Sequence, residues 1–286
     1  MIEILKRISI NPFFWPVIIG ALLTGQFIEI ITLFGIVIIH ELGHVFTAKS
    51  YGWDIIEIEL LPFGGVAKAE QKSDSVREEF IVAIAGPLQN FMMIFVALGF
   101  KQLGVWSNDW ATFFIHANLW IGLFNLLPIS PLDGSKILKT LLYLFFSFRK
   151  AMMISFFSSF VMALFFLLWS SGILLFDKVN MNGLVLSVFF IYTNWMEVRQ
   201  VPYFFWKFLL QKANAAPKRN VPAVPIILKQ DTPVIHALYL LRKERYHLFY
   251  LISEQGELVK ILPEEKVLKN VLKEKEIYQP IDQLNV

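Results

Sequence analysis

Five residues near the start of the chain, His40-Glu41-Leu42-Gly43-His44, combine two imidazoles and a carboxylate at fixed spacing. On a helix, the four-residue interval places both histidines on one face about one turn apart, where they can share one zinc ion. Glu41 lies one residue around the helix, so its carboxylate can reach a water at the metal, as a general base must. The pattern predicts hydrolysis by metal-activated water, although five such letters also occur by chance in soluble helices.

A third ligand must come from elsewhere, because a catalytic zinc ion commonly has three protein ligands and a water. The chain has no cysteine, so this ligand is a histidine or a carboxylate. Asp133 is the candidate, because prolines and a glycine interrupt the apolar segment 125–134, NLLPISPLDG. Such irregular backbone is tolerated at membrane depth only where it lines a protein or water cavity. The alternative is a surface turn in which Asp133 caps the next helix.

Other polar residues of the same region could act in the site or only in packing. Asn125 could donate its amide to the carbonyl oxygen of a scissile peptide, as oxyanion stabilisers do. An interhelical hydrogen bond explains it equally well. His116 and Asn118 lie nearer the other end of this span, where packing or interfacial roles are expected.

The elements that position these residues are membrane helices. Of the 286 residues, 56% are hydrophobic and 17% charged, which excludes an ordinary soluble domain. A net charge of +3 does not indicate nucleic acid as a partner. Apolar segments long enough to cross a bilayer predict six spans, at 12–31, 30–50, 80–103, 110–128, 151–176 and 182–199.

The motif lies deep in the second of these spans. At 1.5 Å per residue, His40 is about 15 Å from Ile30 at one end and about 13 Å from Lys49 at the other. Ionisable residues at mid-bilayer are costly and mark functional sites, which disfavours a purely structural histidine pair. Lysine and arginine alternate between successive loops, so the positive-inside rule predicts that both termini are cytoplasmic.

The last quarter of the chain has a soluble composition. We expect a membrane domain at 1–212, a linker rich in proline and alanine at 213–225, and a separate domain at 226–286. Its pattern predicts strand, helix, strand, strand and helix, an α+β order similar to one CBS domain.

A β-hairpin is predicted between the second and third spans. Segment 54–59 alternates loosely, and 66–70 follows a turn with the sequence Pro62-Phe63-Gly64-Gly65. An exposed edge of this hairpin could hold substrate backbone by strand addition. The alternative is a loop hairpin that does not touch substrate.

Together, four motifs resemble the site-2 protease family of intramembrane zinc metalloproteases. They are HELGH at 40–44, PFGG at 62–65, AGP at 85–87 and NLLPxxPLDG at 125–134. The resemblance implies that His40, His44 and Asp133 bind zinc, that Glu41 activates water and that Asn125 faces the active site. It also implies a loop dipping toward the site at Phe63, Gly64 and Gly65.

Six spans with one C-terminal CBS domain are similar to the family members that remove the pro-sequence of a sporulation sigma factor. This similarity implies a multi-pass protein of the mother-cell membrane around the forespore, membrane partner proteins that inhibit it, and ATP at the CBS domain. The usual hydroxyl and aspartate of a CBS nucleotide site are replaced by Lys260-Ile-Leu-Pro-Glu-Glu265. A lone CBS unit also predicts pairing between two chains.

Two other classes of protein fit parts of the pattern. A CBS-regulated membrane transporter or channel would also have six spans, and its intramembrane ionisable residues could line an ion path. The chain shows no internal repeat of the kind that many transporters have. A zinc-binding scaffold without activity would not need Glu41.

Overall fold

The computed structural model describes residues 8–10, 25–61, 64–70, 75–173, 179–214, 222–274 and 277–284. The chain divides into two compact units. One consists of Met1–Ser73 and Arg77–Ile137, and the other consists of Asp74–Val76 and Leu138–Val286.

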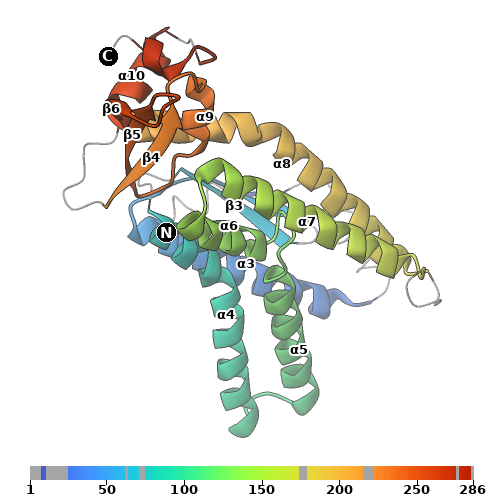
Figure 1. Ribbon diagram of the computed structural model, residues 1–286. Coiled ribbons are helices and arrows are strands. Elements are labelled where there is room, and N and C mark those ends of the chain that lie inside the picture. The colour runs from blue at the N-terminus through green and yellow to red at the C-terminus, as the bar shows by residue number, and fades with distance from the viewer. Residues whose placement is uncertain are drawn as a thin grey trace. The chain divides into compact units, whose positions relative to one another are not determined.

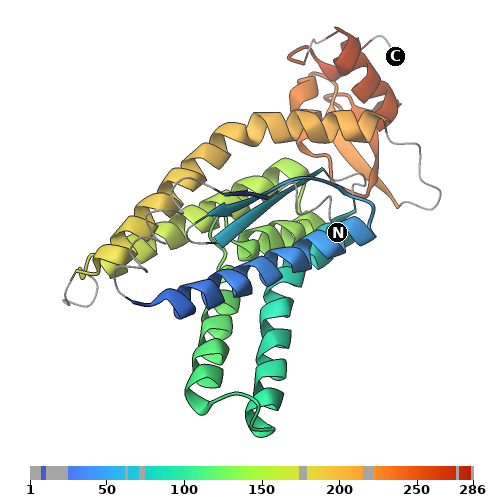
Figure 2. The same cartoon turned by 180° about the vertical axis from the view of Figure 1, so that it is seen from behind.

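The first unit is built on three long helices, α3 (Phe27–Ser50), α4 (Val76–Gln102) and α5 (Asn108–Asn125). The helix α3 carries the HELGH motif. The helices α4 and α5 run antiparallel beside each other, joined by a short turn (Figures 1 and 2). Ser107 caps α5 by accepting a hydrogen bond from the Trp110 backbone N–H.

A three-stranded sheet lies along α3 (Figure 2). The predicted hairpin is present as β2 (Asp54–Leu61) and β3 (Gly64–Glu70), which pair antiparallel. The strand β1 (Ile8–Ile10), which was not predicted, pairs parallel with β2, so the order is β1-β2-β3. Among the described strands, β3 therefore keeps a free edge, whereas both edges of β2 are paired.

Three described helices are long and apolar enough to span a membrane, namely α3, α4 and α7 (Phe148–Ser170). The expected fourth and sixth spans correspond to helices α5 and α8 (Met181–Asn214). Neither qualifies as a span by length and composition, and the expected first span falls mostly outside the described residues. The count of six spans therefore stays a prediction.

In the second unit, α7 and α8 pack side by side and antiparallel (Figures 1 and 2). Small polar residues allow the close approach: the Ser170 and Ser187 hydroxyl groups lie 3.1 Å apart. The helix α8 continues beyond the predicted end at residue 199, through Pro202, to Asn214. A helix that was not predicted as a separate element, α6 (Asp133–Phe145), precedes α7.

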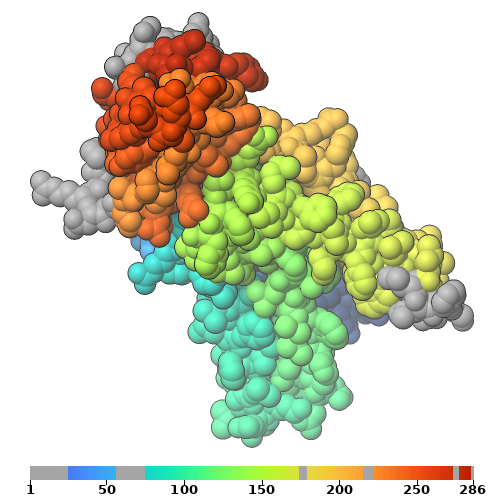
Figure 3. Space-filling view, in the orientation of Figure 1, coloured from blue at the N-terminus to red at the C-terminus, as the bar shows by residue number. Residues whose placement is uncertain are grey.

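The tail has the predicted element order. It consists of β4 (Ala223–Lys229), α9 (Val234–Tyr239), β5 (Tyr246–Ile252), β6 (Leu258–Pro263), α10 (Glu264–Glu274) and the short 3-10 helix η1 (Ile281–Gln283). The strand β5 is central, parallel to β4 and antiparallel to β6. Alternate residues of β5 are buried, so one face of the sheet packs against the helices of the tail. Figure 3 shows the surface of the tail in orange and red.

A buried polar network joins the tail to the end of α8. His247 Nδ1 lies 2.7 Å from Glu264 Oε2, and Lys212 Nζ lies 3.2 Å from Glu264 Oε1. The Arg242 backbone N–H donates to His247 Nε2, which must therefore be unprotonated. The proton is then on Nδ1, and the ring is neutral. Burial lowers the pKa of His247, the cations Lys212 and Arg242 act in the same direction, and Glu264 opposes them.

We predict that the tail loses stability as the pH falls below about 6.5, the ordinary pKa of histidine. The folded pKa of His247 is depressed, so the unfolded chain binds more protons in this range and unfolding is favoured. The measurement is the thermal unfolding midpoint of the full chain in detergent between pH 7.5 and 5.5. His247→Gln should flatten this pH dependence, and His236→Gln, at an exposed tail position, should leave it intact. A midpoint equally sensitive to pH in both variants would contradict the prediction.

Candidate metal centre

The two motif histidines are buried and share one face of α3, as their spacing predicts. Their Nε2 atoms lie 3.3 Å apart. Asp133, the first residue of α6, brings its Oδ2 atom to 3.0 Å from His40 Nε2 and 2.8 Å from His44 Nε2. Three potential ligand atoms from two distant segments therefore converge, and these residues form the cluster of His and carboxylate groups able to hold a metal within the described part of the chain.

The chemistry and spacing of this cluster fit zinc. Imidazole nitrogen and carboxylate oxygen are ordinary zinc ligands, and tetrahedral ligands at about 2.0–2.1 Å from the ion are about 3.3 Å from one another. The distances between the three atoms of the cluster are close to this value. Three protein ligands leave the fourth position of a tetrahedral ion for water or substrate.

The outward-facing nitrogens of both rings are fixed by oxygen acceptors. His40 Nδ1 lies 2.5 Å from Asn90 Oδ1, and His44 Nδ1 lies 2.7 Å from the Val82 carbonyl oxygen. Each acceptor holds the proton on Nδ1, so each Nε2 presents its lone pair toward the cluster. This orientation of ligand rings by a second layer of hydrogen bonds is a general property of metal sites.

Asn90 is itself oriented by a further asparagine. Its amide nitrogen donates to Asn118 Oδ1 at 3.1 Å, and Asn118 donates to the Phe114 carbonyl oxygen at 2.9 Å. Both asparagines are completely buried. Sequence reasoning missed Asn90 and treated Asn118 as a packing or interfacial residue. The available signal was a pair of asparagines inside two apolar spans, where polar groups need partners.

Close approach of α4 to the histidines depends on Gly86. A Cβ atom at this position would lie 2.2 Å from His44 Nε2 and 2.6 Å from His40 Nε2. Any side chain here would therefore occupy the place of the metal. Gly86, the middle residue of the AGP sequence at 85–87, is thus a steric requirement of the candidate centre.

The segment before α6 turns tightly to deliver Asp133. A Cβ atom on Gly134 would lie 2.2 Å from the Leu126 carbonyl oxygen, so only glycine fits there. Asp133 is buried, and its second oxygen, Oδ1, pairs with Lys136 Nζ at 2.9 Å. The alternative of an exposed turn is wrong, because Asp133 is buried and is itself the first residue of α6.

The other predicted site residues are placed as follows. Glu41 is buried beside His40, and no hydrogen bond from the described residues holds its carboxylate. Asn125 ends α5, where its amide donates to the Ile121 carbonyl oxygen at 3.0 Å. No hydrogen bond among the described residues links Asn125 to the cluster. Gly64 and Gly65 begin β3, and Phe63 lies outside the described residues.

Comparison with known proteins defines the class. Residues 28–104 match the profile of peptidase family M50. The chain is 31% identical over 284 residues to Stage IV sporulation protein FB of Bacillus subtilis, covering 99% of this chain and 97% of that protein. The chain therefore belongs to peptidase family M50, the site-2 proteases, and is an integral membrane metalloprotease of that type.

A sequence and a solved structure from one archaeon are also similar to large parts of the chain. Zinc metalloprotease MJ0392 of Methanocaldococcus jannaschii is 31% identical over 254 residues, covering 87% of this chain and 67% of that protein. The solved structure of a site-2 protease from Methanocaldococcus jannaschii superposes with a TM-score of 0.54 at 32% identity. It covers 66% of this chain and 89% of its own.

We predict that Gly86→Ala abolishes zinc binding, because the added methyl group collides with both Nε2 atoms. The measurement is the zinc content of the purified protein by elemental mass spectrometry. Gly99→Ala is the matched control, since it lies on the same helix and its Cβ would meet no atom within 4 Å. Wild-type zinc content in Gly86→Ala would contradict the geometry described here.

We predict that Asn90→Leu weakens zinc binding by about 10–100-fold, the usual cost of losing a partner that orients a ligand. The leucine removes the acceptor of His40 Nδ1 while keeping a similar volume. Asn194→Leu is the control, because Asn194 is also buried and, among the described residues, donates to the Phe190 carbonyl oxygen of its own helix. Competition with a zinc chelator gives the affinity, and equal affinities in the two variants would remove Asn90 from the centre.

Proposed function

We propose that this protein is an intramembrane zinc metalloprotease that hydrolyses a peptide bond of a membrane-associated protein. The observation that carries the proposal is the convergence of His40 Nε2, His44 Nε2 and Asp133 Oδ2 beside the buried Glu41. Three ligands and an adjacent base, which no hydrogen bond from the described residues holds, are the parts that a hydrolytic metal centre requires.

Each residue has a distinct role in the proposed reaction. His40, His44 and Asp133 hold the zinc ion, which when bound supplies Lewis-acid polarisation of the scissile carbonyl and acidifies water. Glu41 takes a proton from the attacking water and returns it to the leaving amine. Asn125 donates its amide to the carbonyl oxygen, where negative charge develops.

The sheet offers a place for extended substrate. Because β1 occupies one side of β2, the edge available for strand addition among the described strands is β3. Backbone hydrogen bonds to this edge would replace those that a helical substrate loses on unwinding. Gly64 and Gly65, at the start of this edge, and the preceding Phe63 are proposed to contact the substrate.

The substrate we favour is a sporulation sigma factor precursor, from which the enzyme removes the pro-sequence. Similarity over nearly the whole chain to a stage IV sporulation protein supports this assignment. The same assignment implies six spans with both termini cytoplasmic, a location in the mother-cell membrane around the forespore, and inhibitory membrane partner proteins.

We propose a CBS-like regulatory tail at 226–286, connected by a linker at 213–225 to a membrane domain at 1–212. The βαββα order and the mixed sheet of the tail support this assignment. The described residues give no support to ATP binding there, because the sequence after β6 has Glu264 in place of a hydroxyl residue and that carboxylate is already paired. Pairing of two chains through the tail completes the proposal.

We predict that Glu41→Gln lowers cleavage of a co-expressed precursor by about 10²–10⁴-fold, the usual contribution of a general base. Zinc content should remain at the wild-type level, because the three ligands are untouched. Glu29→Gln is the matched control, since it makes the same chemical change at an exposed position of the same helix. Cleavage is followed by immunoblotting of the precursor and product.

Two outcomes would overturn the proposal. Undiminished processing by Glu41→Gln would remove this residue from the mechanism. Zinc content independent of His40, His44 and Asp133 would instead favour the transporter or channel, whose intramembrane charges need not bind zinc.

A further inference from the structure

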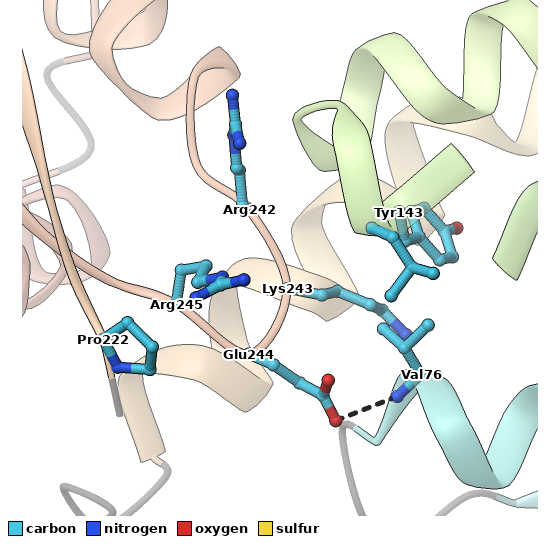
Figure 4. Close-up of a pocket in the computed structure, with 8 residues that line it drawn as sticks. Val76, Tyr143, Pro222, Arg242, Lys243, Glu244 and Arg245 are labelled. Atoms are coloured by element: carbon cyan, nitrogen blue, oxygen red, sulfur yellow. Dashed lines mark hydrogen bonds between the residues drawn. The ribbon is translucent and has the colours of Figure 1, made fainter. Parts of the chain in front are cut away.

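A cavity of about 240 Å³ lies in the second unit, beside the loop that connects α9 to β5. Its lining includes three cationic residues of this loop, Arg242, Lys243 and Arg245 (Figure 4). The remaining lining residues are Val76, Tyr143, Leu144, Pro222 and Glu244. The proposed protease chemistry uses none of these residues.

The loop places more positive than negative charge at the cavity. Within the described part of the chain, the guanidinium groups of Arg242 and Arg245 make no hydrogen bond or ion pair. Lys243 is buried, with its ammonium 4.9 Å from the centre of the Tyr143 ring. Glu244 is the carboxylate of the lining, and it accepts a hydrogen bond from the Val76 backbone N–H at 3.1 Å. The net charge of the lining therefore favours an anion.

The backbone of this loop adopts an energetically unfavourable conformation at one residue. Glu244 has a φ of 52°, a left-handed conformation that is uncommon for residues other than glycine. Such conformations persist only where the surrounding structure imposes them, and they concentrate at functional sites. Here the backbone turns at Glu244 between Lys243 and Arg245, so that residues on both sides of the turn line the cavity (Figure 4).

The cavity lies at the end of a candidate membrane span. The Phe148 backbone N–H, at the first residue of α7, donates to the Leu241 carbonyl oxygen at 2.9 Å. The next residue, Arg149, stacks its guanidinium 3.4 Å from the centre of the Tyr239 ring. Because α7 begins at this point, the cavity lies at the level where a bilayer meets water.

Apolar groups adjoin the charged lining. Leu144 lines the cavity and is half exposed, and the next residue, Phe145, has 68% of its surface exposed. A volume of about 240 Å³ is below the ~300–1,000 Å³ typical of pockets that enclose a whole drug-sized ligand. The site therefore suits a phosphate headgroup whose apolar part lies outside, against the end of α6.

We propose that this cavity binds the phosphate group of an anionic membrane phospholipid. Arg245 pairs with the phosphate, Arg242 adds its positive charge to the lining, and Leu144 and Phe145 contact the acyl region. Basic sites beside membrane helices recognise anionic lipids by this combination of charge and position. Lipid bound here would join the tail loop to the start of α7 at the membrane surface.

The test measures lipid binding by native mass spectrometry of the full chain in a nonionic detergent. Dioleoylphosphatidylglycerol should bind more tightly than dioleoylphosphatidylcholine, whose headgroup has no net charge. R242Q/R245Q should weaken binding of the anionic lipid by about tenfold or more, as expected for two cations lost at a membrane surface. K266Q/K269Q is the matched control, because it removes two exposed lysines of the same tail outside the cavity and should bind as the wild type does.

A second variant tests the site without removing its cations. Glu244→Gln keeps an oxygen acceptor for the Val76 N–H but deletes the negative charge, so binding of the anionic lipid should tighten. Equal binding in the wild type, R242Q/R245Q and Glu244→Gln would overturn the proposal. Displacement of the lipid by inorganic phosphate or ATP at equal concentration would also overturn it, and would assign the cavity to a soluble phosphate compound.

Discussion

The candidate centre depends on the orientation of two imidazole rings. His40 and His44 can act as ligands together only if both Nε2 atoms are unprotonated and aimed at one point. Asn90 Oδ1 and the Val82 carbonyl oxygen impose this state by accepting from the opposite nitrogens. Both acceptors belong to α4, so this helix supports a candidate site whose potential ligands lie on α3 and at the start of α6.

The same constraint explains the unusual polarity and the small residues of α4. A helix that must approach the histidines closely has no room for a side chain at Gly86. The same helix needs a buried amide at Asn90 to accept a hydrogen bond from His40. Burying that amide is costly unless its own donors are satisfied, which explains Asn118 on α5. The polar groups of three helices thus form one chain of hydrogen bonds that ends at the cluster of His40, His44 and Asp133.

In the second unit, a buried polar group is again stabilised by protein partners, here outside the candidate membrane spans. Glu264 is buried, and both of its oxygens are occupied, by His247 and by Lys212 from α8. A buried carboxylate is tolerated because its partners replace water. This network joins the tail to the end of α8, and the Phe148–Leu241 and Arg149–Tyr239 contacts join it to the start of α7. The tail is therefore attached at the ends of both helices.

Local patterns in the sequence determined much of this protein. The four-residue interval of the histidines, the hairpin at 54–70 and the βαββα order of the tail follow from helical and strand periodicity, which acts within a few residues. Periodicity contains no information about which distant residues meet. Asp133 was therefore predicted as a ligand by composition and family resemblance, α6 and β1 went unrecognised as elements, and Asn90 was missed. Tertiary structure alone decided which of these residues and elements meet, because the approach of α4 to α3 depends on packing between segments that are far apart in the chain.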